Sequence, residues 1–186
     1  MKEIAVNVAV IQDNQILLTQ RDDFETWILP GGGVEDRESI TQAAIRETKE
    51  ETGLDVELSR LVGIYSRLGN ILTGHVVLFV GKQIGGEIKC QEGETIAVKW
   101  FPFDQIPSPL SLGHDRRISD AISGVGGGVT VTQEFYLTNQ KRKIGRNKLY
   151  KLRDKSGLWR QKFYLRLVER LELKEKVEVE GNDLDT

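Results

Sequence analysis

Three glutamates, Glu47, Glu50 and Glu51, are spaced so that they can act together. If this stretch is helical, they share one face, because residues three and four apart in an α-helix are neighbours. Like charges at that spacing destabilise an isolated helix by about 0.2–0.5 kcal/mol per pair. A hard divalent cation would offset the repulsion, since Mg²⁺ is held by carboxylates, water and substrate phosphates. The spacing therefore indicates a site for a hard divalent cation such as Mg²⁺.

The helix that must carry these carboxylates has recognisable ends. Ser39 is a favourable N-cap, and Gln42 completes a capping box three residues later. Gly53 stands where a left-handed residue commonly ends a helix. We therefore expect a helix from about Ile40 to Thr52.

The residues around this helix can position its acidic face. Arg46 can reach Glu50 one turn later, or fold back towards Glu38 in the preceding loop. Ahead of that loop, the glycine run from Gly31 to Gly33 allows the main chain to approach a metal or a phosphate closely.

These residues together form a longer motif. Gly32, Glu38 and the run RETKEETGL from Arg46 to Leu54 follow the pattern G-x5-E-x7-R-E-U-x-E-E-x-G-U, in which U is a bulky aliphatic residue. The pattern resembles the signature of the Nudix hydrolase family, and every fixed Gly, Glu and Arg position matches. Thr48 is the departure, because an aliphatic residue is expected there. A threonine at this position can bond back to the carbonyl of Ala44.

The resemblance covers residues 1–123 and implies a fold and an activity. The implied fold class is α/β, an α/β/α sandwich with a mixed sheet. The implied activity is Mg²⁺-dependent (or Mn²⁺-dependent) hydrolysis of a phosphoanhydride in a nucleoside diphosphate linked to another group. In this family the metal ligands would be the Gly31 carbonyl and the carboxylates of Glu47, Glu50 and Glu51.

The resemblance also implies roles for other acidic and basic residues. Glu38 and Arg46 are assigned to positioning. A further Glu before a strand often binds metal or acts as a base in the family, and Glu94 has the better spacing, with Glu92 in reserve. The group that takes the proton from water stays open between Glu51, Glu47 and Glu94.

Several side chains are candidates for contacting the substrate. Phe24, Trp27 and Tyr65 have rings that can stack on a base, although such residues are more often part of a core. Arg21 and Arg67 can pair with phosphate oxygens, although surface ion pairs are the commoner role.

The hydrophobic pattern predicts the elements that support this site. Alternating, β-branched-rich segments predict strands over residues 4–11, 15–21, 27–29, 55–67, 75–82 and 98–101. A second helix is expected over about 115–123, just after His114, for which we expect a capping or loop role.

The chain continues beyond the resemblance. We expect a Gly-rich connector at 124–128, a basic extension at 129–176 and an acidic, disordered tail at 177–186. Within the extension we expect a strand over 129–137 and an amphipathic helix over 158–173. The apolar stripe of that helix would pack on the core or on a second subunit, giving a homodimer. Its basic stripe is either a solvated face or a surface for nucleic acid.

Composition narrows the classes of protein. Hydrophobic residues make up 39% and charged residues 29%, which suits a soluble domain. No apolar run approaches the ~20 residues of a membrane span, so no membrane partner is expected. Cys90 is the only cysteine, which excludes an intrachain disulfide and favours a reduced, cytoplasmic setting.

The substrate is left open by the sequence. Candidates are ADP-ribose and other sugar nucleotides, dinucleoside polyphosphates, and normal or oxidised nucleoside triphosphates. The chain starts directly in its first strand, which argues slightly against ADP-ribose. Two rival functions also remain: a nucleotide-sensing binding module with little hydrolysis, and an RNA 5′-end pyrophosphohydrolase that uses the basic extension.

Overall fold

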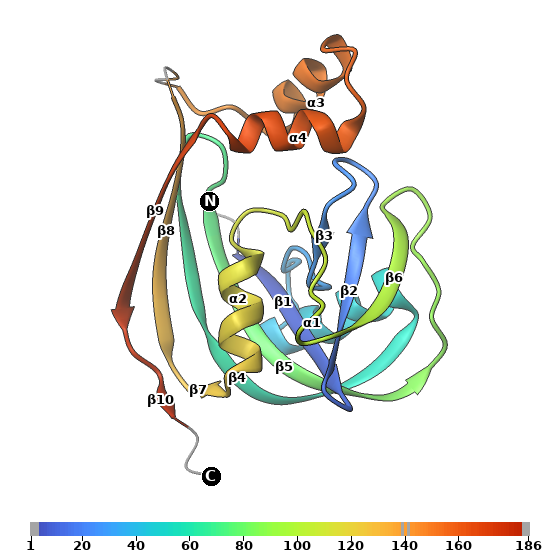
Figure 1. The fold of residues 1–186 in the computed structure, drawn as a ribbon. Coiled ribbons are helices and arrows are strands. Elements are labelled where there is room, and N and C mark those ends of the chain that lie inside the picture. Colours follow the sequence, from blue (N-terminus) through green and yellow to red (C-terminus); the bar gives the residue numbers. More distant parts are fainter. Residues whose placement is uncertain (1–3, 139, 141, 184–186) are drawn as a thin grey trace.

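One mixed sheet organises the molecule in the computed structural model, which describes residues 4–138, 140 and 142–183 (Figure 1). The strands run in the order β3-β2-β1-β5-β4-β8-β9, and β6 pairs with β2. Their bounds are β1 Ile4–Gln12, β2 Gln15–Arg21, β3 Trp27–Ile28, β4 Leu54–Gly69, β5 Gly74–Gly86, β6 Thr95–Pro102, β8 Val129–Leu137 and β9 Leu171–Val179. The β1–β5 and β4–β8 pairs are parallel, and the other pairs are antiparallel.

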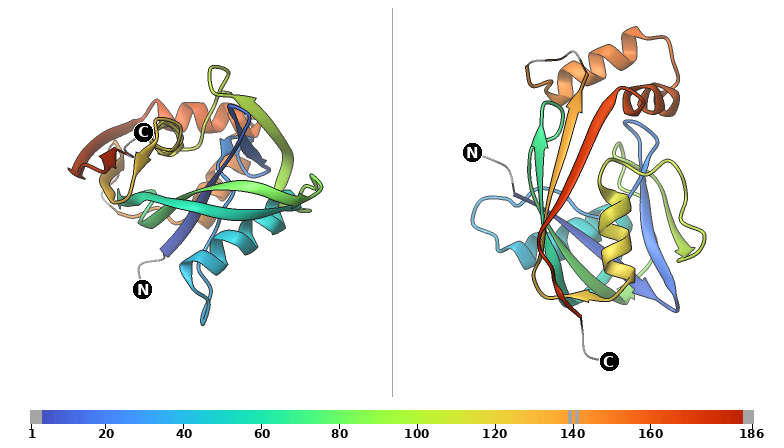
Figure 2. Two further views of the ribbon diagram at one scale, coloured as in Figure 1. Left: turned by 90° about the horizontal axis from the view of Figure 1, so that it is seen from below. Right: turned by 60° about the vertical axis from the view of Figure 1, so that its left-hand side comes forward.

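Two helices cover opposite faces of this sheet. Helix α1 (Ile40–Thr52) lies on one face and α2 (His114–Ile122) on the other, as the view from below shows (Figure 2). Alternation along β1 serves both layers: Val6 and Val8 join the cluster that holds Ala43 and Ala44 of α1, whereas Ala9 joins the cluster that holds α2. The α/β/α architecture is confirmed.

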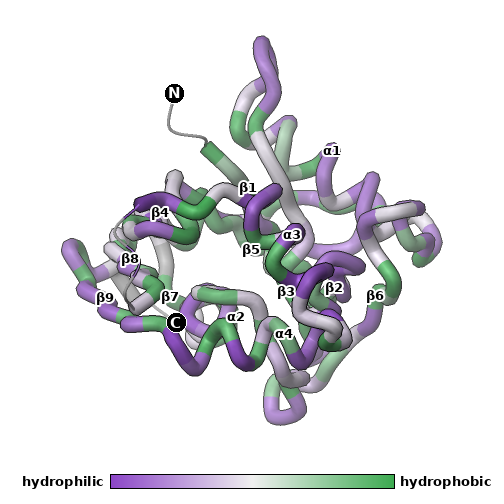
Figure 3. The backbone as a smooth tube through the Cα atoms, turned by 90° about the horizontal axis from the view of Figure 1, so that it is seen from above, coloured by the Kyte–Doolittle hydropathy of each residue, from purple (hydrophilic) through white to green (hydrophobic). Residues whose placement is uncertain are grey.

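The C-terminal part adds strands to the same sheet. Strand β8 lies parallel to β4, and β9 pairs antiparallel with β8 to form the sheet edge. Hydrophilic and hydrophobic residues alternate along β9 (Figure 3). A separate two-stranded sheet joins β7 (Val125–Gly126) to β10 (Asn182–Asp183).

The prediction of a helix over residues 158–173 is wrong for the residues after Val168. Helix α4 spans only Arg160–Val168, and from Leu171 the chain is strand β9. The sequence LELKEKVEV alternates with period two, so it suits a strand, and pairing with β8 outweighs helix propensity there. A further helix, α3 (Arg146–Lys155), lies in the basic segment where no helix was expected.

The expected disorder of the acidic tail is also corrected for part of its length. Residues 177–179 belong to β9 and Asn182–Asp183 form β10, while residues 184–186 lie outside the described residues. The division of the chain into a domain of residues 1–123 and an extension stays a prediction. No helix of the described residues is long and apolar enough to span a membrane.

Candidate active site

Helix α1 is fixed at both ends as predicted. The hydroxyl of Ser39 accepts from the Gln42 amide at 3.2 Å, and the Gln42 side chain accepts from the Ser39 amide at 2.7 Å. Gly53 ends the helix with φ 75°. The buried Thr48 hydroxyl donates to the Ala44 carbonyl at 2.8 Å, which satisfies its polar group where the family motif has an aliphatic side chain. Thr48 is therefore accommodated at this position of the motif without disturbing the acidic face.

The glycine loop is held between β1 and α1. The carbonyls of Pro30 and Gly32 accept from the amides of Val8 and Val6, each at 2.9 Å. In a planar trans peptide the amide points opposite to the preceding carbonyl, so the Gly31 amide faces away from β1. This amide donates to the Glu51 carboxylate at 3.0 Å.

Only glycine fits at the turning point of this loop. Gly31 has φ +145°, and a Cβ there would lie 2.1 Å from the Val6 carbonyl oxygen. A Cβ on Gly32 would lie 2.4 Å from a carboxylate oxygen of Glu47. The glycines therefore let two of the predicted metal-binding glutamates lie directly against the main chain.

Glu51 is the most enclosed of the acidic groups, with 4% of its surface exposed. Burial raises the pKa of its carboxyl to about 7, and repulsion from Glu47 and Glu94 acts in the same direction. The Gly31 amide and the charge of Arg21 oppose this rise. The pKa of half-buried Glu47 is also raised, first by burial. A cation beside these groups would relieve both penalties.

Arg46 organises the rest of the acidic face. Its guanidinium lies 2.6 Å from Glu38, 3.0 Å from Glu47 and 3.2 Å from Glu50. It also donates to the Gly33 carbonyl at 3.1 Å. We expected Arg46 to contact either Glu50 or Glu38, and it contacts both. One side chain thus ties the loop to two glutamates of α1.

The donor set fits a divalent cation in its chemistry. Within the described part of the chain, no three acidic, His or Cys side chains converge into a ready metal cage. Mg²⁺ does not need one, because it keeps several waters and binds one or two carboxylates together with substrate phosphates. Glu51 and Glu47, with raised pKa values beside Gly31, supply oxygens of that kind.

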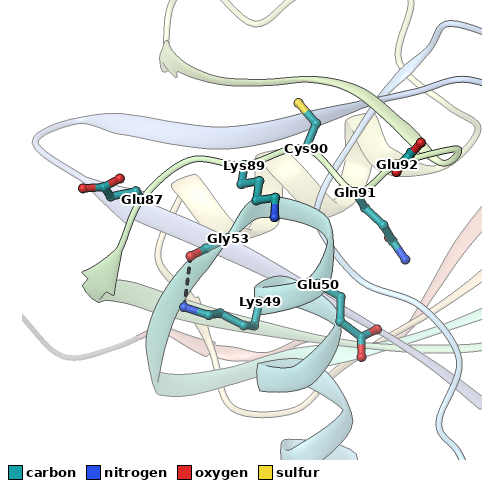
Figure 4. Close-up of a pocket in the computed structure, with 8 residues that line it drawn as sticks. All are labelled: Lys49, Glu50, Gly53, Glu87, Lys89, Cys90, Gln91 and Glu92. Atoms are coloured by element: carbon teal, nitrogen blue, oxygen red, sulfur yellow. Dashed lines mark hydrogen bonds between the residues drawn. The ribbon is translucent and has the colours of Figure 1, made fainter.

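The loop before β6 brings a fourth carboxylate near this face. Glu94 raises the pKa of both Glu47 and Glu51 by repulsion, so it lies within electrostatic range of them. Glu92 instead lines a hollow of about 490 Å³ at the outer side of the α1 C-terminus (Figure 4). The other residues around that hollow are Lys49, Glu50, Gly53, Glu87, Lys89, Cys90 and Gln91.

The candidate substrate residues have different surroundings. Arg21 forms an ion pair with Asp23 at 2.8 Å, and its charge lowers the pKa of Glu51, so it lies beside the acidic face. Phe24 packs against aromatic rings of α3 and α4. Trp27 is 8% exposed and meets Phe101 edge-on at 4.8 Å.

The remaining two candidates lie on β4. Arg67 stands in register with Gly74 and Gln133 on the neighbouring strands. Tyr65 is fully buried and donates to Asp120 at 2.7 Å. The structure therefore brings Arg21 to the acidic face and places the Tyr65 ring in the core.

Two buried polar residues support the loop, and sequence reasoning gave neither of them this role. The His114 Nδ1 accepts from the Leu29 amide at 3.1 Å, and the Asn7 side chain donates to the Leu29 carbonyl at 3.3 Å. Asn7 was detectable as an amide in the middle of an apolar strand, IAVNVAVIQ. The pairing of His114 with Leu29 had no local signal, because 85 residues separate them.

Known proteins resemble this chain in sequence and in structure. A model of the NUDIX domain matches residues 1–121. An ADP-ribose pyrophosphatase of Methanocaldococcus jannaschii is 37% identical over 122 residues, which cover 63% of this chain and 71% of that protein. An 8-oxo-dGDP phosphatase of Homo sapiens is 30% identical over 118 residues, which cover 60% of this chain and 35% of that protein. The crystal structure of an ADP-ribose pyrophosphatase from Streptococcus suis has a TM-score of 0.58 at 26% identity, covering 78% of this chain and 98% of that one.

The sandwich fold, the glycine loop and the acidic helix face together define a hydrolase of phosphorylated substrates. The chain belongs to the Nudix family, and it is an enzyme that acts on phosphoanhydride bonds.

The buried histidine makes stability depend on pH. The pKa of His114 lies well below its usual value because burial disfavours the charge and Arg117, Arg67 and Arg21 repel it. Below about pH 6.5 this histidine binds a proton in the unfolded chain but stays neutral in the folded chain. The free energy of unfolding therefore falls as pH falls. We expect a slope of up to about 1.4 kcal/mol per pH unit between pH 6.5 and 5 from this residue.

The matched variant is His114→Asn, which keeps an acceptor near the Leu29 amide but cannot take a proton. Urea unfolding at several pH values should give a shallower decline for this variant than for the wild type. Identical slopes in the two proteins would contradict a neutral, buried His114.

Proposed function

We propose that this enzyme is a Mg²⁺-dependent or Mn²⁺-dependent pyrophosphatase that cuts a nucleoside diphosphate linked to another group. The observation that carries the proposal is the enclosed pair Glu47 and Glu51, packed against Gly31 and Gly32 with raised pKa values. A polyanionic substrate can approach such a face only when a cation lies between them.

The metal-binding role falls to residues of α1 and the glycine loop. Glu47, Glu50, Glu51 and the Gly31 carbonyl would hold the ion. When bound, a divalent ion lowers the pKa of its water and neutralises charge on the phosphoryl group. Gly31 supports this assignment, because its amide already contacts Glu51 and its main chain therefore lies against the acidic face.

The other residues of the face orient and assist. Arg46 bridges Glu47 and Glu50 and anchors them to Glu38. Arg21 can pair with a phosphate oxygen of the substrate, since its guanidinium lies within electrostatic range of Glu51 and is braced by Asp23. Water loses its proton to one of Glu51, Glu47 or Glu94, the three carboxylates that influence one another electrostatically.

The identity of the leaving group is tested with a substrate panel. ADP-ribose, diadenosine polyphosphates, nucleoside triphosphates and their oxidised forms would each be incubated with Mg²⁺, and products read with and without EDTA. ADP-ribose is the first compound to test, because proteins similar to this chain are named ADP-ribose pyrophosphatases. We expect turnover of at least one compound that EDTA abolishes. Tight nucleotide binding without turnover would favour the sensing module instead.

Glu51→Gln is the sharpest change at the acidic face. The amide can still accept from Gly31 but carries no charge for a metal or a proton, so we expect kcat to fall by at least about 10²-fold while the fold survives. Circular dichroism checks the fold. Glu57→Gln is the matched control, because Glu57 is an exposed glutamate that pairs with Lys82 on β5. A Glu51→Gln enzyme with near-normal kcat would exclude Glu51 as both ligand and base.

RNA 5′-end hydrolysis is the second candidate function. The observation that favours it is the position of α3 and α4. Both helices carry exposed cations, and both pack on the loop after Arg21. Those cations include Lys148, Lys151, Lys155, Lys162 and Arg166. If RNA binds there, affinity for 5′-triphosphate RNA should fall steeply with salt, and Lys151→Gln with Lys155→Gln should flatten that slope. Affinity that does not change with salt would exclude this candidate.

A further inference from the structure

The C-terminal helices are fastened to the loop that follows Arg21. The Tyr150 hydroxyl of α3 donates to the Asp23 carboxylate at 2.9 Å, and Arg153 donates to the Asp23 carbonyl at 2.6 Å. On α4, Arg160 donates to the Asp22 carbonyl at 2.7 Å and also pairs with the Asp22 carboxylate. The matched NUDIX domain ends at residue 121, so these helices lie beyond it.

Aromatic packing closes the same junction. The Phe24 ring lies 6.2 Å from Phe163 in a stacked arrangement and 5.8 Å from Tyr150. The Arg153 guanidinium lies over both the Phe24 and Tyr150 rings. Phe24 therefore packs against α3 and α4, and these two helices lie next to the loop between β2 and β3 (Figure 1).

Two lines of contact run from this junction to the acidic face. Asp23 accepts two hydrogen bonds from the Arg21 guanidinium, at 2.8 and 3.0 Å, and Arg21 acts electrostatically on Glu51. The Asp22 amide donates to the Glu94 carbonyl at 2.8 Å, which fixes the main chain of the fourth carboxylate. Helix α3 thus contacts Asp23, which contacts Arg21. Helix α4 contacts Asp22, which contacts Glu94.

We propose that Tyr150 and Arg160 are positioning residues for catalysis: Tyr150 holds Arg21 through Asp23, and Arg160 holds the Glu94 segment through Asp22. The proposal rests on the proposed function in two respects, the role of Arg21 towards phosphate and that of Glu94 as a candidate base. A guanidinium braced in one orientation loses less entropy when it binds an oxyanion. A Glu94 backbone that is fixed on the loop keeps its carboxylate within range of Glu47 and Glu51.

The kinetic test separates positioning from general stability. Tyr150→Phe removes one hydroxyl and keeps the ring, so we expect KM to rise by about fivefold with kcat little changed. This is less than the full loss of a hydrogen bond to a charged group, because Tyr150 acts on the substrate only through Asp23 and Arg21. Tyr136→Phe is the matched control, because it removes a hydroxyl from an exposed ring on β8. For the second line, Arg160→Gln should lower kcat by about threefold, whereas Lys174→Gln removes a charge from an exposed side chain on β9 and should not.

A double-variant cycle shows whether the effect passes through Arg21. In an Arg21→Ala background, Tyr150→Phe should have no further effect on KM, because the residue that it positions is gone. The same fold-change in both backgrounds would overturn the proposal for Tyr150. A response of Tyr150→Phe equal to that of Tyr136→Phe, or of Arg160→Gln equal to that of Lys174→Gln, would overturn the corresponding line of contact.

A measurement that needs no substrate keeps this proposal apart from the proposed function. The Arg21 Nε–H signal in a ¹⁵N NMR spectrum, assigned by its loss in Arg21→Lys, should shift and exchange faster with water in Tyr150→Phe than in Tyr136→Phe. An unchanged signal overturns the positioning role whatever the substrate is. If the signal changes but the wild type turns over nothing in the panel, the positioning role stands and the proposed function fails.

Discussion

Repulsion among carboxylates on one turn of α1 is the constraint on which the rest of the site depends. Glu47, Glu50 and Glu51 crowd one face, and two of them are partly or wholly removed from water. The protein manages this charge locally: Arg46 bridges Glu47 and Glu50, and the Gly31 amide donates to Glu51. These contacts hold the face together but do not neutralise it, which is why it suits a cation and an anionic substrate.

The rest of the fold holds in place the loops that surround this acidic face. Strand β1 holds the glycine loop from one side, and α1 closes it from the other. His114 of α2 reaches across the core to the residue just before the loop. The C-terminal helices hold the far end of β2, where Arg21 leaves the sheet. The glycine loop is therefore braced by elements from the beginning and the middle of the chain, and the loop that follows Arg21 is braced by helices from its end.

Contacts within the motif could be predicted because their partners are close in sequence. The capping box of Ser39 and Gln42 and the contacts of Arg46 with Glu38 follow from helix geometry. The pairing of Tyr150 with Asp23 spans 127 residues and has no such signal. Strand β9 was misassigned in part because Leu167 and Leu171 also fit a helical stripe, and the partner strand that decides the matter lies more than thirty residues away. Contacts between residues close in sequence could thus be predicted, whereas contacts between distant segments could not.

Binding of Mn²⁺, followed by electron paramagnetic resonance, tests whether the α1 face and Gly31 hold a divalent cation. We expect the wild type and Glu57→Gln to bind Mn²⁺ with similar affinity, and Glu47→Gln to bind it at least about tenfold more weakly. Equal affinity in Glu47→Gln and the wild type, or no Mn²⁺ binding even with a nucleoside diphosphate present, would contradict this expectation.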